Sequence, residues 1–272
     1  MVFKNRKEDL RPKSFLAMHP ILFKIGPLVI HSYGVLAATA FLVGGGFVFR
    51  LARKENISGE LILDLLTLGL ISGLLGARLF WVVLFSEEIS YWWEIFTIWK
   101  GGQVFYGGII FSLLIGILYL RKKKANLWKI ADLFGVGIPL AFSVARWGCV
   151  CAGCCYGKPT DVSWGITFTN LLSLAPLNVK LHPTQIYHSL HNFLIFLLLW
   201  AILGRKKFDG EVFWLYLLFY PIGRFIIEFW RGDYPEVLFG LDNPQVISLY
   251  IIPIAIVGLW ECKRKFQLLK RE

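Results

Sequence analysis

The stretch ADLFGVGIPLAFSVARWGCV, residues 131–150, contains only one acidic and one basic residue, Asp132 and Arg146. About 20 mostly apolar residues form an α-helix long enough to cross the hydrocarbon core of a bilayer. The stretch therefore predicts a transmembrane helix. It continues directly into CAGCCYGKPTD, residues 151–161, which is rich in cysteine and glycine. A charged arginine within a bilayer costs at least about 2.5 kcal/mol, so its presence here needs a physical reason.

Working outward from this helix, the chain contains six more apolar segments of similar kind. They cover residues 27–49, 61–85, 104–120, 187–203, 211–230 and 245–261. The whole sequence is 56% hydrophobic and 17% charged, whereas soluble domains are about 25% charged. The segments are too long and too evenly apolar for barrel strands, which would alternate. We therefore predict an all-α integral membrane protein with about seven transmembrane helices in a single polytopic domain, residues 1–272.

The positions of lysine and arginine predict how these helices are oriented. Sixteen of the 29 cations lie in segments of one side, namely 50–60, 121–129, 204–210 and 262–272, and ten lie in the opposite set. Cations near span ends stay on the cytoplasmic side, so we predict an outer N-terminus and a cytoplasmic C-terminus. Trp92, Trp93 and Trp99 suit an aromatic belt at the outer interface. These loops explain the net charge of +11, and we expect no nucleic-acid binding.

Three cations remain, and they lie within or at the edge of predicted spans: Arg78, Arg146 and Arg224. One interpretation is structural, because Arg224 and Glu228 are four residues apart on one helix face and can neutralise each other. The alternative is an anion site. Guanidinium groups bind phosphate oxygens in pairs and are always protonated. We favour an anion site that holds a phospholipid headgroup, with Glu228 positioning Arg224 and with Arg231 at its rim.

Other polar residues gather at the predicted outer ends of the same spans. Tyr33 lies at the outer end of the first span, and Tyr106 precedes Gly107 and Gly108, where backbone can approach a ligand closely. The sequence LHPTQIYHSLHNF adds three candidates at the start of the fifth span: His182, Gln185 and His188. Together with the arginines, they make up a predicted substrate site on the outer side.

Four cysteines follow Arg146 within seven residues: Cys149, Cys151, Cys154 and Cys155. Zinc sites usually combine two close ligands with two distant ones, and here all four are local. Cys151 and Cys154 form a C-x-x-C pair, so metal or redox chemistry is an open alternative. We interpret the cluster as packing and turning positions, and we predict no metal ion.

Several motifs, taken in order, resemble those of the prolipoprotein diacylglyceryl transferases. They run along residues 19–260 as HSYGVLAATAFLVG, GARLFWVV, YGGII, RWGC with AGCCYGKPTD, HPTQIYHSL, GRFIIEFWRGD and PQVISLYIIP. The resemblance implies seven helices and an enzyme of lipoprotein biosynthesis in the bacterial cytoplasmic (inner) membrane. Such enzymes move the diacylglyceryl group of phosphatidylglycerol onto the lipobox cysteine of preprolipoproteins. A thioether forms, glycerol phosphate leaves, and no cofactor is needed.

The resemblance also assigns roles to individual residues. It implies that Tyr33 contacts the headgroup, Arg146 binds the phosphate, and Gly157 occupies a tight backbone position. Arg224 would steady the leaving phosphate, with Glu228 orienting it. Cations near the leaving oxygens would stabilise the charge that grows there, and the substrate thiol must become a thiolate to attack.

Three positions depart from the family pattern. Tyr106 stands where the family has a histidine before two glycines, Cys149 replaces an asparagine, and His188 replaces a glutamate. Tyrosine titrates near pH 10, so Tyr106 is a poor base for a thiol. One hypothesis is that His188 or His182 removes the proton. Another is that the chain uses a different lipid or acceptor.

A transporter or a non-catalytic thiol or metal protein is the remaining alternative. A transporter of this size should show a repeat between its two halves, and the sequence contains none that is convincing. A metal protein should bind stoichiometric metal when purified. The ordered motifs and the three arginines favour the transferase.

Overall fold

The structure is a computed structural model that describes residues 19–26, 28–88, 93, 102, 104–233 and 235–269. Their contacts divide the chain into two compact units. One holds the chain up to Gly44 together with the chain from Gly135 onward, and the other holds Gly45–Phe134. Each unit is described by itself, and the single domain over 1–272 stays a prediction.

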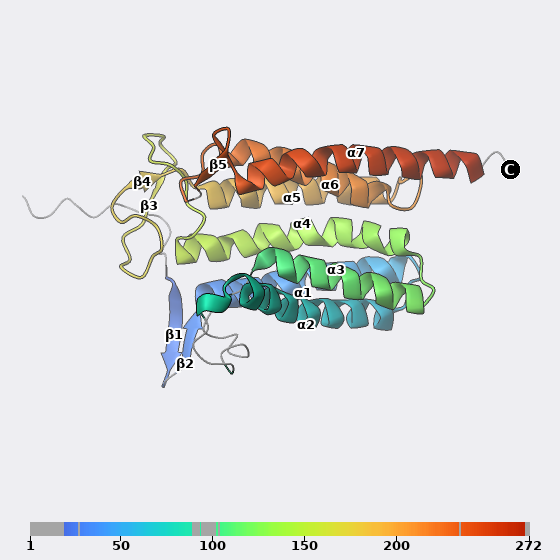
Figure 1. The fold of residues 1–272 in the computed structure, drawn as a ribbon, viewed down its shortest axis with the longest axis horizontal. Coiled ribbons are helices and arrows are strands. Elements are labelled where there is room, and N and C mark those ends of the chain that lie inside the picture. Colours follow the sequence, from blue (N-terminus) through green and yellow to red (C-terminus); the bar gives the residue numbers. More distant parts are fainter. Residues whose placement is uncertain are drawn as a thin grey trace, which may run out of the picture. The chain divides into compact units, whose positions relative to one another are not determined.

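Seven α-helices form in the described part of the chain, and each overlaps one predicted apolar segment (Figure 1). They are α1 (Ser32–Lys54), α2 (Gly59–Leu84), α3 (Phe105–Lys122), α4 (Leu127–Ala152), α5 (Thr184–Leu203), α6 (Glu211–Glu228) and α7 (Asn243–Leu269). A 3₁₀ turn, Ser86–Glu88, follows α2. The prediction of a mainly helical protein is confirmed.

Five of these helices, namely α1, α2, α4, α5 and α7, are long and apolar enough to cross a membrane. Large apolar side chains on them face outward: Leu42 is 71% exposed, Val83 is 69% exposed and Ile254 is 58% exposed. In water such surfaces would be costly, whereas lipid tails solvate them. The helices therefore have the surface of a membrane protein.

The start of the first helix differs from the prediction. Residues 27–49 were expected to be helical, but Leu28–His31 form strand β2, which pairs antiparallel with β1 (Ile21–Ile25). Helix α1 begins at Ser32, whose hydroxyl donates to the His19 carbonyl. The hydropathy of the apolar run Leu28–Ile30 is compatible with a strand as well as with a helix. The run forms a strand because it pairs with β1 in a hairpin.

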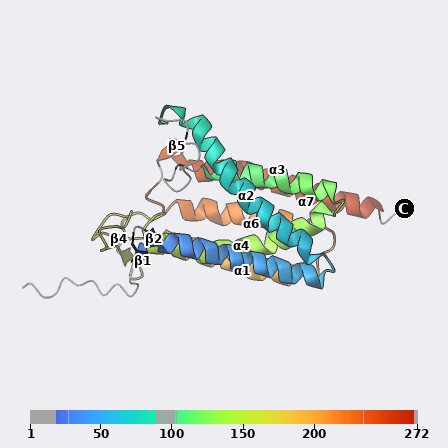
Figure 2. The same cartoon turned by 90° about the horizontal axis from the view of Figure 1, so that it is seen from below.

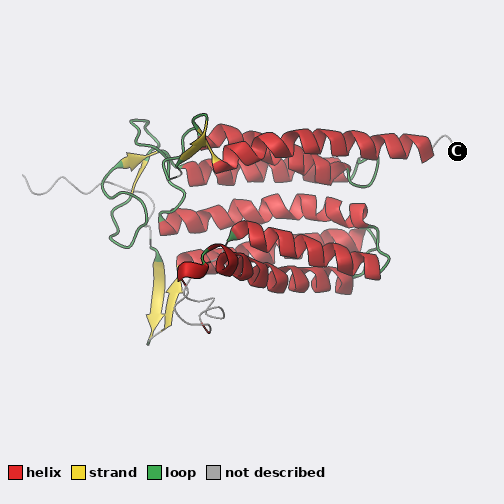
Figure 3. Ribbon diagram, in the orientation of Figure 1, coloured by secondary structure: helices red, strands yellow, loops and turns green. Residues whose placement is uncertain are grey.

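Within the larger unit, α5 contacts α6 and α6 contacts α7, and the three run side by side in Figure 1. Four short strands lie beyond the ends of these helices (Figure 3). β3 (Ile166–Thr167) pairs with β4 (Lys180–Leu181), and β5 (Glu236–Leu238) pairs with β6 (Leu241–Asp242). The β3–β4 loop has its own small core of Phe168, Ala175 and Leu181. This unit therefore carries folded loops at one end of its helices.

In the smaller unit, α2 and α3 pack closely against each other (Figure 2). A Cβ added to Gly107 would lie 2.6 Å from the carbonyl oxygen of Gly76, so the two backbones nearly touch. Ser112 of α3 donates to the carbonyl of Gly69 at 2.8 Å. Small residues at helix contacts are typical of membrane proteins.

Trp92 and Trp99, two of the predicted belt residues, lie outside the described residues, and Trp93 is 50% exposed.

Candidate functional site

Arg146 lies in the last two turns of α4, where its guanidinium group is only partly exposed. Its Nη1 donates to the sulfur of Cys155 at 3.5 Å. Among the described residues no carboxylate lies within 4 Å of it. Arg146 is therefore an arginine on a membrane-length helix that forms no ion pair with any described residue.

Tyr33 belongs to the same surroundings as Arg146. It is the second residue of α1, and its ring lies against Gly148 of α4, where an added Cβ would be 3.2 Å from Cδ2 of the ring. The tyrosine side chain is 50% exposed. Gly148 is two residues from Arg146 on α4. The exposed phenol of Tyr33 can therefore contact a polar headgroup that reaches the arginine.

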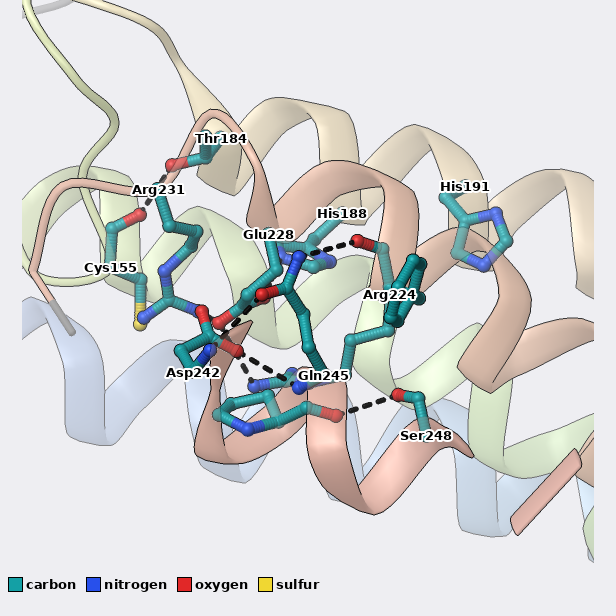
Figure 4. A network of polar contacts seen from close by, with 12 residues as sticks. Cys155, Thr184, His188, His191, Arg224, Glu228, Arg231, Asp242, Gln245 and Ser248 are labelled. Atoms are coloured by element: carbon teal, nitrogen blue, oxygen red, sulfur yellow. Dashed lines mark hydrogen bonds and ion pairs between the residues drawn. The ribbon is translucent and has the colours of Figure 1, made fainter. Parts of the chain in front are cut away.

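Glu228, at the end of α6, is the centre of a charged cluster (Figure 4). Its Oε1 lies 3.2 Å from Nη1 of Arg231 and 3.7 Å from Nη2 of Arg224. Its Oε2 lies 3.7 Å from Nε2 of His188, which comes from α5. The carboxylate therefore joins Arg224 of α6, Arg231 just after α6 and His188 of α5, and Arg224 pairs with it as the spacing of four predicts.

Several polar atoms of this cluster are buried without a hydrogen bond to any described residue. They are the Oε1 of Gln185, both ring nitrogens of His188 and both carboxylate oxygens of Glu228. Gln185 and His188 are fully buried, and Glu228 is 3% exposed. Most buried polar groups in proteins are hydrogen-bonded, and exceptions occur at functional sites. Three predicted site residues thus have buried polar atoms without a hydrogen-bond partner among the described residues, and two of them, His188 and Glu228, face each other.

Arg231 was expected at the rim of the site, and this expectation is wrong. The residue is 4% exposed. Besides Glu228, it donates from Nε and Nη2 to the two oxygens of Asp233 at 2.8 and 3.0 Å. Burial disfavours its charge, but the hydrogen bond to Asp233 and the nearby negative groups raise the pKa of Arg231 above its usual value. It lies inside the cluster as a permanent cation.

Arg231 is buried because the loop that contains Gly157 makes backbone contacts with the loop that contains Arg231. Gly157 forms a bridge with Arg231, and Lys158 N donates to the Trp230 carbonyl at 2.8 Å. A Cβ on Gly157 would lie 2.5 Å from the His182 carbonyl oxygen and 2.8 Å from that of Trp230. Only glycine fits between these two backbones. Gly157 is a tight backbone position that holds the loop of Arg231 in place.

The cysteine turn joins Arg146 to this region. Gln185 and Thr184, at the start of α5, donate to the carbonyls of Cys154 and Cys155 at 2.8 and 2.7 Å. The sulfurs of Cys149, Cys154 and Cys155 lie within 4.8 Å of one another. Hydrogen bonds from the other two thiols lower the pKa of the Cys155 thiol, and the charges of Arg231 and Arg146 act in the same direction.

His182 lies outside the charged cluster, in the loop before α5. Its Nδ1 is 3.2 Å from the hydroxyl of Tyr187, which also accepts a hydrogen bond from Nε1 of Trp164 at 2.8 Å. His182 is partly exposed. The structure therefore pairs this histidine with a tyrosine, whereas His188 faces a carboxylate.

Four predicted site residues belong to the smaller unit. Arg78 is 6% exposed, donates to the Gly102 carbonyl at 3.0 Å and lies 4.3 Å from the ring centroid of Trp81. Gly107 and Gly108 meet the backbone of α2 rather than open space, since an added Cβ on Gly108 would be 2.9 Å from the Gly73 carbonyl oxygen. The close approach we expected toward a ligand is thus a helix contact. Tyr106 is 46% exposed.

Several residues of the cluster were not expected from the sequence. Tyr220 accepts a hydrogen bond from Nη1 of Arg224 at 3.4 Å, and Gln245 donates to the Phe225 carbonyl at 3.3 Å. Gln245 and Asp242 also exchange backbone–side-chain hydrogen bonds at 2.9 and 3.1 Å, which caps α7. The pattern D-x-x-Q before an apolar run is a helix-start signal and was available in the sequence. The roles of Asp233 and Tyr220 have no local signal.

Comparison with known proteins agrees with the motifs. Residues 20–261 match the family model described as "Prolipoprotein diacylglyceryl transferase". A phosphatidylglycerol–prolipoprotein diacylglyceryl transferase of Clostridium tetani is 38% identical over 240 residues, covering 88% of this chain and 96% of that protein. Proteins of the same name from Finegoldia magna and Clostridioides difficile are 34% and 32% identical, covering 94% and 89% of this chain and 99% and 92% of their own lengths. The chain therefore belongs to the prolipoprotein diacylglyceryl transferase family.

Proposed function

We propose that this chain transfers the diacylglyceryl group of phosphatidylglycerol to the cysteine thiol of preprolipoproteins, forming a thioether and releasing glycerol phosphate. Membership of the family supports this reaction, and the matched relatives carry its name. The single structural observation that carries the proposal is Arg146, a guanidinium group on a membrane-length helix with no carboxylate within 4 Å among the described residues.

The chemistry of Arg146 suits a phospholipid phosphate. A guanidinium group can donate two parallel hydrogen bonds to phosphate oxygens, and it sheds water more readily than an ammonium group. Its contact with the Cys155 sulfur, at 3.5 Å, is weak and replaceable. A phosphate anion is therefore the partner that offsets the cost of placing this charge at the membrane.

The cluster around Glu228 supplies the remaining requirements of the reaction. As the bond between carbon and the phosphate oxygen breaks, negative charge grows on the departing glycerol phosphate. Arg224 is held by Glu228 and Tyr220 but keeps part of its side chain, 17%, exposed. It can therefore stabilise the leaving group, while the buried Arg231 pairs with Glu228 at 3.2 Å and holds it in position.

We further propose seven membrane spans with the N-terminus outside, the C-terminus in the cytoplasm, and a location in the bacterial inner membrane. α3 and α6, each of 18 residues, would be the two further spans. The excess of lysine and arginine in the loops 50–60, 121–129 and 204–210 supports this orientation. It puts Arg146 and the Glu228 cluster on the outer side, where exported preprolipoproteins arrive.

The proton of the substrate thiol goes to His188 in this proposal. Tyr106 replaces the histidine of the family pattern, and His188 faces Glu228, which would stabilise the imidazolium ion. Replacing His188 with glutamine is expected to lower kcat by about 100-fold, the usual contribution of a general base. Phosphatidylglycerol binding should change less than about twofold, because no phosphate contact is removed. Transfer kinetics and lipid binding in detergent check both.

His191→Gln is the matched control, since His191 lies one turn further along α5, packs against Gly223 and approaches the Tyr220 carbonyl at 3.4 Å, but forms no ion pair with Glu228. Its turnover should equal that of the unmodified chain. Thermal unfolding of both variants separates a folding defect from a chemical one. Unchanged turnover in a folded His188→Gln protein rejects His188 as the base and directs attention to His182.

Complementation tests the proposed function directly. The chain is expressed in a bacterial strain depleted of its own prolipoprotein diacylglyceryl transferase. Restored growth, together with a lipid-modified prolipoprotein detected by mass spectrometry, is the expected result. A well-expressed chain that fails to restore either contradicts the proposed substrates and favours another lipid or acceptor, in line with the departures at Tyr106 and Cys149.

A further inference from the structure

The turn that we expected to serve only packing brings three thiols together. The sulfurs of Cys149, Cys154 and Cys155 lie within 4.8 Å of one another, and Cys149 is 7% exposed. The predicted C-x-x-C pair is not the unit that forms, because Cys151 is outside this group. The three cysteines are called the thiol triad below.

The backbone of this turn is held so that the triad converges. Gly153 N donates to the Cys149 carbonyl at 2.9 Å and ends α4. The side chains of Thr184 and Gln185, on α5, donate hydrogen bonds to the carbonyls of Cys155 and Cys154. Cys155 has a φ of 59°, a left-handed conformation that costs a non-glycine residue about 1 kcal/mol or more. The turn maintains this strain, and the result is a convergent set of sulfurs.

The spacing of the sulfurs fits a tetrahedral metal ion. With Zn–S bonds of about 2.3 Å, two sulfurs on one zinc ion are about 3.8 Å apart. The triad has to contract by no more than about 1 Å to reach this value. Among the described residues no fourth cysteine, histidine or carboxylate joins the group. Three protein ligands and one open position are the arrangement found in catalytic zinc sites.

The charges around the triad are also suitable. Three thiolates and one Zn²⁺ ion carry a net charge of −1. Arg146 already donates to one of the sulfurs, at 3.5 Å, and such a hydrogen bond is the kind of outer contact that steadies a metal ligand. The arginine would therefore balance the charge of the loaded site rather than repel the ion.

We propose that Cys149, Cys154 and Cys155 form a binding site for one thiophilic metal ion, Zn²⁺, with its fourth position open to water or to an incoming thiol. The ligands of this site and its test involve no lipid, although the site shares its neighbour Arg146 with the proposed phosphate site. The metal lies beside Arg146, at the junction of the α4 end and the α5 start.

Cobalt titration of the reduced full-length chain in detergent tests the site. Co²⁺ is expected to bind once per chain and to produce thiolate-to-cobalt charge-transfer bands, which Zn²⁺ then abolishes by displacement. Serine at any one triad position should weaken binding by about 100-fold or more, because losing a ligand exceeds the 10–100-fold cost of an outer-contact change. Cys151→Ser, in the same turn, and Cys262→Ser, on α7, should bind as the unmodified chain does.

Thiol labelling gives a second readout that needs no variant. Zn²⁺ is expected to slow maleimide labelling of the three triad cysteines, identified by mass spectrometry, and to leave Cys151 and Cys262 equally reactive. The proposal is overturned if the reduced chain shows no charge-transfer bands, if the bands persist in a folded Cys155→Ser protein, or if Zn²⁺ protects none of the triad. Circular dichroism confirms that each variant is folded.

Discussion

Replacing Arg146 with alanine is expected to lower kcat/KM for diacylglyceryl transfer by about 10³-fold, which corresponds to about 4 kcal/mol of transition-state stabilisation. The reason is that the guanidinium group would donate to the phosphate both when the lipid binds and when charge accumulates on the leaving oxygens. Its hydrogen-bond partner in the structure is the Cys155 sulfur, at 3.5 Å, and not a carboxylate. Initial rates with phosphatidylglycerol and a lipobox peptide measure the effect.

Two further variants serve as controls for the Arg146→Ala measurement. Arg146→Lys keeps the charge but loses the paired hydrogen bonds, so its kcat/KM should lie between those of alanine and arginine. Arg264→Ala removes an arginine on α7 whose side chain is 59% exposed and lies near Glu261, at 3.8 Å, and the ring of Trp260. That change should leave transfer unaltered. Normal kcat/KM in the alanine variant at position 146 would contradict the phosphate-binding role.

Glu228→Gln is expected to destabilise the folded protein by about 3 kcal/mol, because removing one partner of a buried ion pair leaves the opposite charges without compensation. Glu228 is 3% exposed and lies within 3.7 Å of both Arg224 and Arg231. Asp233 continues to hold Arg231, at 2.8 Å, so the chain should still fold. Denaturant unfolding in detergent micelles, followed by circular dichroism, measures the loss.

The control for this variant is an ion pair at the surface. Asp209→Asn breaks the contact with Lys206 at 2.8 Å, where the aspartate side chain is 36% exposed. Exposed pairs contribute about 0–1 kcal/mol, so the free energy of unfolding should hardly change. Equal, small losses for both variants would show that Glu228 does not stabilise the cluster, and its role would then be limited to orienting Arg224.

The apolar spans could be predicted because hydropathy is a local property of the chain. Each predicted segment overlaps one helix of the described part. The first boundary was wrong at Leu28–His31, because those residues pair with Ile21–Ile25 across a turn at Gly26. A run of apolar residues does not indicate whether its backbone hydrogen bonds form within a helix or to a neighbouring strand.

Some of the buried cations could also be identified from the sequence, and others could not. Arg146 and Arg224 could be identified because they interrupt apolar runs, and their charge at that depth demands a reason. Arg231 follows the run and was placed at the rim, yet it is 4% exposed. Its burial depends on the loop that crosses it at Gly157, which is far away in the sequence. No pattern around residue 231 contains that information.

The helices, the two cations on α4 and α6 and the family motifs could all be predicted from the sequence, since each of these depends on residues that are close along the chain. The tertiary contacts show, in addition, that Glu228 joins His188 of α5 to Arg224 of α6 and to Arg231 just after α6, and that three of four neighbouring cysteines converge. The physical reason is that burial and pairing depend on contacts between segments that are far apart in the chain. Those contacts form only when α4, α5 and α6 and their loops pack together.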